Sequence, residues 1–251
     1  MESEIAWGPS VEAQGVFAVP GAPPRAAVLL CHGLMSNRES GTNRALTERL
    51  CAHRVATLRF HFVGHGDGSP LADLTLTRCL DQVNGALAWL AKQGFAQIGL
   101  VGSSFGGLVA ILAAARHPTL FAVGLKCPVS DYPPLWRSRL GEGGMRHWQE
   151  SGLLTFAGPG GKARLGYAFY EDLLRYPTES AAQKIQSPTR IIHGDADPDV
   201  PVAQSLRLFS VLKSPKEICV IPGADHEFSR AEDFEQMIGG LTEWMLATRS
   251  A

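Results

Sequence analysis

Short hydrophobic runs alternate with longer segments of helical periodicity along most of the chain. Continuous apolar runs are typical of strands buried on both faces, whereas apolar residues three and four positions apart are typical of amphipathic helices. The runs predict strands at 26–31, 55–60, 98–101, 121–125, 189–193 and 217–221. The helical spacing predicts helices at 42–54, 76–93, 105–116 and 228–248. Strands that alternate with helices predict the α/β class, with a mostly parallel sheet covered by helices on both faces.

One segment, residues 128–187, breaks this alternation. It is rich in glycine and proline, lies between two predicted strands and is too long for a simple crossover. We therefore expect an insertion that covers the strand ends within a single domain spanning residues 1–251. Its aromatic side chains fit either the wall of an apolar acyl or aryl pocket or a small satellite core, and both remain open. They are Tyr132, Trp136, Trp148, Phe156, Tyr167, Phe169, Tyr170 and Tyr176.

The overall composition narrows the choice of partners. The 251 residues include 45% hydrophobic and 19% charged residues and carry a formal net charge of -1. A chain of this size buries a sufficient core without disulfides or metals. Because no basic run or basic helix face stands out, nucleic acid is not an expected partner. The oligomeric state is left open by the sequence.

The cysteines and the N-terminus bear on the cellular compartment. The chain has 5 cysteines, an odd number, with no C-x-x-C pair and no Cys/His spacing typical of a metal site. The first residues are acidic and lack the apolar core of a secretory signal. No apolar stretch is long enough to span a membrane. These features predict a cytoplasmic protein with reduced thiols.

A turn at residues 102–106 carries the first candidate chemistry. Gly102, Ser104 and Gly106 form a G-x-S-x-G pattern between a predicted strand and a predicted helix. A strained strand-to-helix turn exposes the serine hydroxyl and points backbone N–H groups at a reacting oxygen. We expect a Cβ atom at either glycine to collide with neighbouring backbone. Taken alone, the pattern also fits a glycine-rich turn that only packs a helix against the sheet.

Two loops that follow later strands carry acidic residues and a histidine. One contains Asp195, Asp197 and Asp199, and the other ends at Asp225 and His226. Parallel strands all end at one edge of the sheet, so both loops should lie beside Ser104. Taken alone, the acidic cluster also fits a solvated turn, and His226 also fits an ordinary surface histidine.

Five motifs in this order resemble the α/β-hydrolase superfamily, nearest its small serine esterases and the related acyl-peptidase branch. The resemblance extends from His32 to His226 and is far more specific than any one motif. The motifs are H-G at residues 32–33, G-H-G at 64–66, G-x-S-x-G at 102–106, H-G-x-x-D-x-x-V-P at 193–201 and G-x-x-H at 223–226.

This resemblance implies a role for each matching residue. Ser104 would be the nucleophile, His226 the general base and then acid, and Asp197 the residue that orients His226, with Asp195 and Asp199 as rivals. The backbone N–H groups of Leu34 and Phe105 would form the oxyanion hole. Neither a metal nor an organic cofactor is expected, and the expected substrate is a small-molecule ester.

The second motif departs from the superfamily pattern. Relatives often read F-D-x-R-G-H-G, whereas His61 and Val63 stand here in place of the aspartate and the arginine. We expect His61 to pack under the loop rather than to react, and His32 to brace its loop. The departure puts the local bracing, and with it the substrate class, in doubt.

Three functional hypotheses follow from these motifs. The first is hydrolysis of carboxylic esters through an acyl-enzyme on Ser104. The second keeps the same three residues but cleaves an amide, a peptide or a C–C bond, since fold and triad do not separate these reactions. The third is a ligand-binding module without catalysis on the same scaffold, which would tolerate the loss of triad residues.

Overall fold

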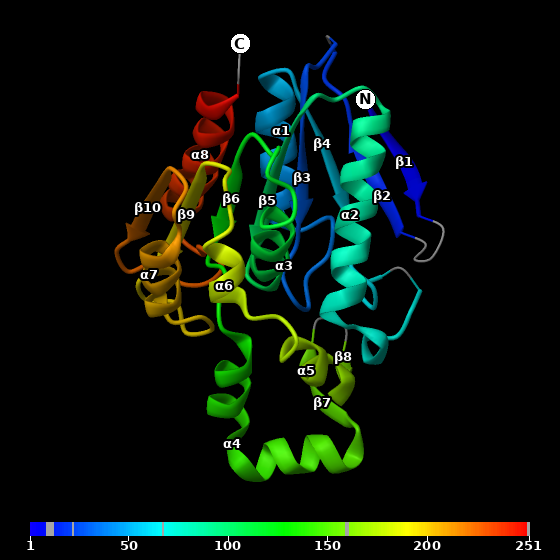
Figure 1. The fold of residues 1–251 in the computed structure, drawn as a ribbon, viewed down its shortest axis with the longest axis vertical. Helices are drawn as coiled ribbons and strands as arrows, with labels where there is room; N and C mark the ends of the chain where they lie inside the picture. The colour runs from blue at the N-terminus through cyan, green and yellow to red at the C-terminus, as the bar shows by residue number, and fades with distance from the viewer. Residues whose placement is uncertain (9–12, 22, 67, 159–160, 250–251) are drawn as a thin grey trace.

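The computed structural model describes the chain except for residues 9–12, 22, 67, 159–160 and 250–251. Within the described residues the main sheet has 8 strands in the order β1-β2-β4-β3-β5-β6-β9-β10 (Figure 1). The strands from β3 onward pair in parallel, and β2 pairs antiparallel with both β1 and β4. Their bounds are β1 Glu2–Trp7, β2 Ala13–Ala18, β3 Ala26–Cys31, β4 Val55–Phe60, β5 Gln97–Ser103, β6 Val123–Lys126, β9 Thr189–Gly194 and β10 Lys216–Ile221.

Helices cover both faces of this sheet. On one face, α1 (Gly41–Ala52) and α8 (Ala231–Thr248) pack over a core that includes Leu30. On the other face, α2 (Leu76–Lys92), α3 (Phe105–Ala114) and α7 (Val202–Val211) pack over a core that includes Leu29. Successive side chains of a strand point to opposite faces, so the unbroken apolar run of β3 fills both cores.

The α/β-hydrolase fold predicted from the sequence is confirmed. All six predicted strands are present, with small shifts at their ends. The antiparallel pair β1–β2 was not predicted, because β1 lies at the sheet edge with mostly exposed polar residues and forms no apolar run. The predicted helix at 228–248 begins only at Ala231, since Phe228 adopts a positive φ of 54° that a helix does not allow.

The segment between β6 and β9 leaves the main sheet and projects from the carboxyl ends of the strands, at the bottom of Figure 1. Glycine produces the bend within its long first helix, where Gly141 has a φ of 64°. The segment consists of α4 Tyr132–Ser151, the antiparallel pair β7 Leu153–Gly158 and β8 Gly161–Gly166, α5 Tyr167–Leu173 and α6 Thr178–Ala182.

The aromatic side chains of this segment serve in two places. Trp148 and Phe169 are fully buried and join the main core. Tyr132 packs edge-on against Phe169, with ring centroids 5.9 Å apart, and also faces a cavity together with Trp136 and Phe156. Some of these rings therefore pack in the core and some line a cavity, and Tyr132 does both.

All five cysteines lie in the described part of the chain, and none forms a disulfide. Among the helices described, none combines the length and the apolar character that crossing a membrane requires.

Candidate active site

Ser104 lies in a strained turn between β5 and α3. Its backbone adopts φ 53° and ψ −117°, a combination that L-residues rarely occupy and that costs of order 1–3 kcal/mol. The turn is held by the Ser104 N–H, which donates to the Lys126 carbonyl at 2.9 Å, and by the Ser104 carbonyl, which accepts from Gly107 and Val129. The hydroxyl faces a cavity at the carboxyl edge of the sheet.

The two glycines of the motif allow this turn to approach its neighbours. A Cβ atom on Gly106 would lie 2.3 Å from the His32 carbonyl oxygen, and one on Gly102 would lie 2.3 Å from the Gly106 carbonyl oxygen. Both distances are far shorter than a van der Waals contact. The atoms that would be hit belong to the backbone, which cannot move aside as a side chain can. The collision expected from the sequence is present at both positions.

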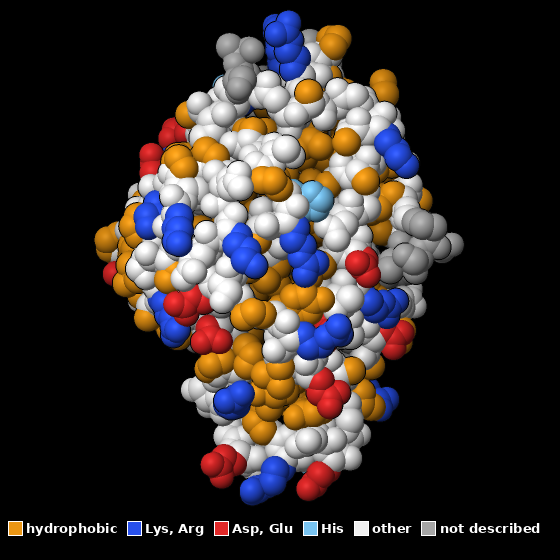
Figure 2. Space-filling view, in the orientation of Figure 1, with side chains coloured by type: hydrophobic (Ala, Val, Ile, Leu, Met, Phe, Trp, Pro, Cys, Tyr) orange, Lys and Arg blue, Asp and Glu red, His pale blue; other side chains and the backbone are white. Residues whose placement is uncertain are grey.

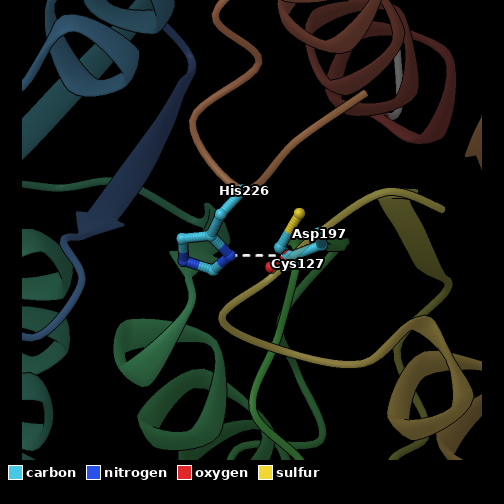
Figure 3. Close-up of side chains that lie close together, drawn as sticks. All are labelled: Cys127, Asp197 and His226. Atoms are coloured by element: carbon cyan, nitrogen blue, oxygen red, sulfur yellow. Dashed lines mark hydrogen bonds and ion pairs between the residues drawn. The ribbon is translucent and has the colours of Figure 1, made fainter. Parts of the chain in front are cut away.

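Asp197 and His226 meet at the ends of β9 and β10. The Nδ1 atom of His226 lies 2.6 Å from Oδ2 of Asp197 (Figure 3). The Asp197 side chain is wholly buried, and the His226 side chain is 9% exposed. With Nδ1–H donated to the carboxylate, Nε2 of His226 is left as the nitrogen able to accept a proton.

Further donors surround the Asp197 carboxylate. The N–H groups of Asp199 and Val200 each donate to Oδ1 at 2.8 Å, and Nε2 of His193 lies 3.1 Å from Oδ2. Burial alone would raise the pKa of Asp197, but the hydrogen bonds from His193, His226 and Val200 together hold it well below its usual range. Asp197 is therefore an anion beside His226 at neutral pH.

His193 is a contact of the site that our sequence reasoning missed. Its ring is fully buried, and Nδ1 lies 2.6 Å from the Ser205 hydroxyl. The available signal was its position at the start of the H-G-x-x-D motif, four residues before Asp197. A histidine at the end of a buried strand can turn back onto its own loop, as this one does.

The rival aspartates lie elsewhere. Asp195 is exposed, and its carboxylate accepts from the Gly223 N–H at 2.6 Å. Asp199 is also exposed, and its carboxylate lies 3.4 Å from the Arg139 guanidinium. Of the three aspartates, Asp197 is the one whose carboxylate contacts His226.

Cys127 lies against the same pair, so that its thiol, Asp197 and His226 could in principle offer ligands to one metal ion (Figure 3). The distance between Asp197 and His226 fits a hydrogen bond better than it fits a pair of ligands on one metal ion. Two ligand atoms on a tetrahedral zinc lie ~3.3 Å apart, whereas Oδ2 of Asp197 and Nδ1 of His226 are 2.6 Å apart. Burial also raises the pKa of the Cys127 thiol, which disfavours the thiolate that metals bind.

Leu34 and Phe105, the two residues expected to form the oxyanion hole, both lie near Ser104. Phe105 follows it in the chain, and Gly33 packs so close that a Cβ there would lie 3.9 Å from the Ser104 hydroxyl oxygen. Within the part of the chain that the structure describes, neither N–H donates to a backbone or side-chain acceptor. Two unpaired donors beside a serine hydroxyl are suited to binding an oxyanion.

Three histidines brace the loop that presents Leu34. His32 is fully buried, and its Nε2 accepts the Phe62 N–H at 3.0 Å. Nε2 of His65 accepts the Met35 N–H at 3.2 Å. His61 packs under Gly66, as expected, and its Nδ1 accepts the Arg38 N–H at 3.4 Å. Of these three rings, His61 stands at the position where relatives often carry an aspartate, and Val63 stands in place of the arginine.

Ser104 and His226 line one cavity of ≈ 620 Å³. The insertion supplies most of its apolar wall, including Trp136, Leu140 and Phe156. Lys126 also lines it, and our sequence reasoning missed this residue. The signal was a charged residue at the last position of a buried apolar strand.

A second cavity, of ≈ 260 Å³, lies where the insertion, including the end of α5, meets α2, α3 and α7. Tyr132 lines both cavities, but neither Ser104 nor His226 lines the second one. Figure 2 shows hydrophobic side chains gathered on this face of the molecule, and Leu174 beside the cavity is 55% exposed. Ser104, Lys126 and His226 all line the larger cavity.

Comparison with known proteins shows which family the chain belongs to. The model of the prolyl oligopeptidase family matches residues 72–248, which is most of the chain. The chain belongs to the prolyl oligopeptidase family. Ser104, Asp197 and His226 lie inside the matched range, whereas Leu34 precedes it. No curated protein sequence matches this family member significantly.

Solved structures of α/β-hydrolases share the fold of this prolyl oligopeptidase family member over nearly its whole length. Est1E from Butyrivibrio proteoclasticus is 23% identical, with a TM-score of 0.82 and 98% of each chain covered. A putative hydrolase from Agrobacterium vitis S4 is 22% identical, with a TM-score of 0.81 and 98% coverage of each chain. Mouse alpha/beta hydrolase domain-containing protein 10 is 21% identical, with a TM-score of 0.78 and 98% and 100% coverage. The chain thus has the α/β-hydrolase fold.

The buried His32 makes stability depend on pH. Burial, and next the neighbouring His65, hold the pKa of His32 well below its ordinary value of 6.5. Below that value the unfolded chain takes up a proton that folded His32 does not, so the free energy of unfolding falls as pH falls. This histidine contributes up to ~1.4 kcal/mol per pH unit to the change in the free energy of unfolding.

We expect His32→Gln to flatten this dependence in denaturant unfolding measured between about pH 7 and pH 5. The exposed His53→Gln should keep the wild-type slope, and equal slopes in all three proteins would contradict the assignment.

Proposed function

We propose that this protein is a serine hydrolase that cleaves carboxylic esters through an acyl-enzyme on Ser104. One observation carries the proposal. A serine in a strained strand-to-helix turn shares a cavity with a histidine whose Nδ1 lies 2.6 Å from a buried, ionised carboxylate. A glycine-rich turn that only packed a helix would need neither the strain at Ser104 nor this pair.

The proposed reaction has two halves. In the first, the Ser104 hydroxyl attacks the acyl carbon while Nε2 of His226 takes its proton. The tetrahedral oxyanion is bound by the N–H groups of Leu34 and Phe105. Its collapse breaks the bond to the alcohol oxygen, and His226 returns the proton to the leaving alcohol.

In the second half, water attacks the acyl carbon of the acyl-enzyme while His226 takes a proton from the water. Collapse then releases the carboxylic acid and returns a proton to Ser104. Throughout, Asp197 stabilises the imidazolium and keeps Nδ1–H turned away from the serine. No step requires a metal or an organic cofactor.

The insertion at 128–187 is proposed to act as a lid within a single domain spanning residues 1–251. Its apolar side chains at the cavity, such as Trp136 and Phe156, would bind an apolar part of the substrate and exclude water. The free thiols of all five cysteines support a cytoplasmic location. A small-molecule ester remains the proposed partner.

The solved structures favour ester cleavage, and the family model favours amide or peptide cleavage. Structures of Est1E with and without bound ferulic acid, and of an esterase domain from a Rhodothermus marinus protein, share the fold. The matching family is named for oligopeptidases, which favours amide or peptide bonds as the second candidate. We place ester cleavage first because the structures of Est1E and of the esterase domain match 97–98% of this chain, whereas the family model matches residues 72–248.

A fluorophosphonate probe tests the nucleophile. We expect the wild-type protein to be labelled at one site, because the probe reacts only with an activated serine. Ser104→Ala should not be labelled, whereas the matched Ser103→Ala, one residue earlier, should retain labelling. Mass spectrometry of the intact protein measures both. Unlabelled wild-type protein, or labelled Ser104→Ala, would contradict the proposal and favour a ligand-binding module.

Replacement of the buried carboxylate tests the Asp197–His226 pair. Asp197→Asn presents an amide to Nδ1 of His226 and removes the anion that orients the ring. We expect kcat for a p-nitrophenyl ester to fall by about 10³–10⁴. Asp195→Asn, on the same loop but outside the cavity, is the matched control and should stay within about threefold of wild type. Equal losses in both variants would remove Asp197 from the reaction.

A substrate panel separates the two bond types. We expect p-nitrophenyl esters of increasing acyl length to be hydrolysed, with the best length set by the cavity, and aminoacyl p-nitroanilides to be poor substrates. Each kcat/KM is followed by absorbance, with Ser104→Ala as the blank. Hydrolysis of the anilides with no turnover of the esters would make the protein a peptidase or amidase instead.

A further inference from the structure

Lys126 is a buried cation beside the candidate nucleophile. It is the last residue of β6, and its carbonyl accepts the Ser104 N–H at 2.9 Å. Its side chain is 3% exposed, and the residue is among those that line the large cavity. A lysine is rarely buried to this extent unless its ammonium group is paired, because removing the charge from water is costly.

The pairing of this ammonium group inside the protein is incomplete. Its closest carboxylate oxygen belongs to Glu227, at 3.8 Å, which is beyond hydrogen-bond distance. The Glu227 side chain is 76% exposed, so its own interactions with water compete with this pair. The Phe228 ring lies 5.5 Å from Nζ and offers a π face. Among the described residues, none accepts a hydrogen bond from Nζ, although an ammonium group has three N–H donors.

The other cation at this cavity is already engaged. The Arg139 guanidinium donates to the Asp199 carbonyl at 2.6 Å and lies 3.4 Å from the Asp199 carboxylate. The wall of this cavity is largely apolar, with Leu34, Val129 and Trp136 among its residues. Lys126 thus provides free donors and a positive charge inside an apolar pocket.

Building on the proposed ester hydrolysis, we propose that the substrate carries a carboxylate on an otherwise apolar acyl or alcohol part, and that Lys126 binds this carboxylate. The substrate anion would replace the distant contact with Glu227, whose exposed side chain is free to turn to water. The attraction between two opposite charges is stronger in a desolvated pocket than in water, and here the burial of Lys126 has already removed one of the two charges from water. Lys126 is therefore a specificity-determining residue rather than a part of the proton transfer.

Matched ester pairs test this inference. On the acyl side, p-nitrophenyl hydrogen glutarate is compared with p-nitrophenyl valerate, in which a methyl group replaces the carboxylate. On the alcohol side, 4-butyryloxybenzoate is compared with 4-methylphenyl butyrate. We expect the wild-type protein to have the higher kcat/KM for the anionic member of at least one pair. Lys126→Met should lower that anionic-to-neutral ratio by about 10- to 100-fold, mainly through KM.

Two further variants sharpen the test. Glu227→Gln removes the internal competitor without altering a buried residue, so it should raise the ratio, and it keeps the test valid if Lys126→Met does not fold. Lys92→Met, at the exposed end of α2 and away from the cavity, should leave the ratio unchanged. The pair that responds shows whether the anion belongs to the acyl or the alcohol part.

The outcomes separate this inference from the proposed function. If the neutral esters are hydrolysed but neither Lys126→Met nor Glu227→Gln changes the ratio for either pair, the inference is overturned and the proposed function stands. If the wild-type protein hydrolyses no ester and is not labelled by the fluorophosphonate, the proposed function itself fails.

Discussion

A close backbone approach at the carboxyl end of β5 is the constraint on which the arrangement of the site depends. The turn at Ser104 reaches a φ of 53° only because Gly102 and Gly106 let the start of α3 contact the end of β3. The same contact brings Gly33 against Ser104, and with it the N–H of Leu34. A single side-chain atom at either motif glycine would push α3 away from β3 and separate the serine from both N–H donors.

Buried charge at neighbouring strand ends is handled in two opposite ways. Asp197, in the loop after β9, receives four donors from His193, His226 and two backbone N–H groups, which keep it ionised although its side chain has no exposed surface. Lys126, at the end of β6, has one distant carboxylate and one aromatic ring as its partners among the residues that the structure describes. A fully paired charge orients its neighbour, whereas an incompletely paired one is available to a ligand. The two residues thus suit the orientation of a base and the recognition of an anion, respectively.

Some elements of the fold could be predicted from the sequence and others could not, and the difference has a physical reason in each case. The strands β3, β4, β5, β6 and β9 are mostly buried on both faces, so each leaves an apolar run that is visible in one dimension. The edge strand β1 leaves no such run, because most of its side chains face water and its pairing with β2 is set by backbone hydrogen bonds. The start of α8 was misplaced because the positive φ of Phe228 is imposed by the loop that carries His226, and no local pattern signals it.

The sequence by itself determined the α/β class, the glycine-flanked turn around Ser104 and the two loops that hold the acidic and histidine candidates. These features are local, since periodicity and turn chemistry are properties of a few neighbouring residues. Only the tertiary structure decided that Asp197 rather than Asp195 or Asp199 contacts His226, and that Lys126 lines the cavity. Such contacts join the ends of different strands, and their geometry arises only when the sheet assembles and the packing of both faces sets the position of each loop.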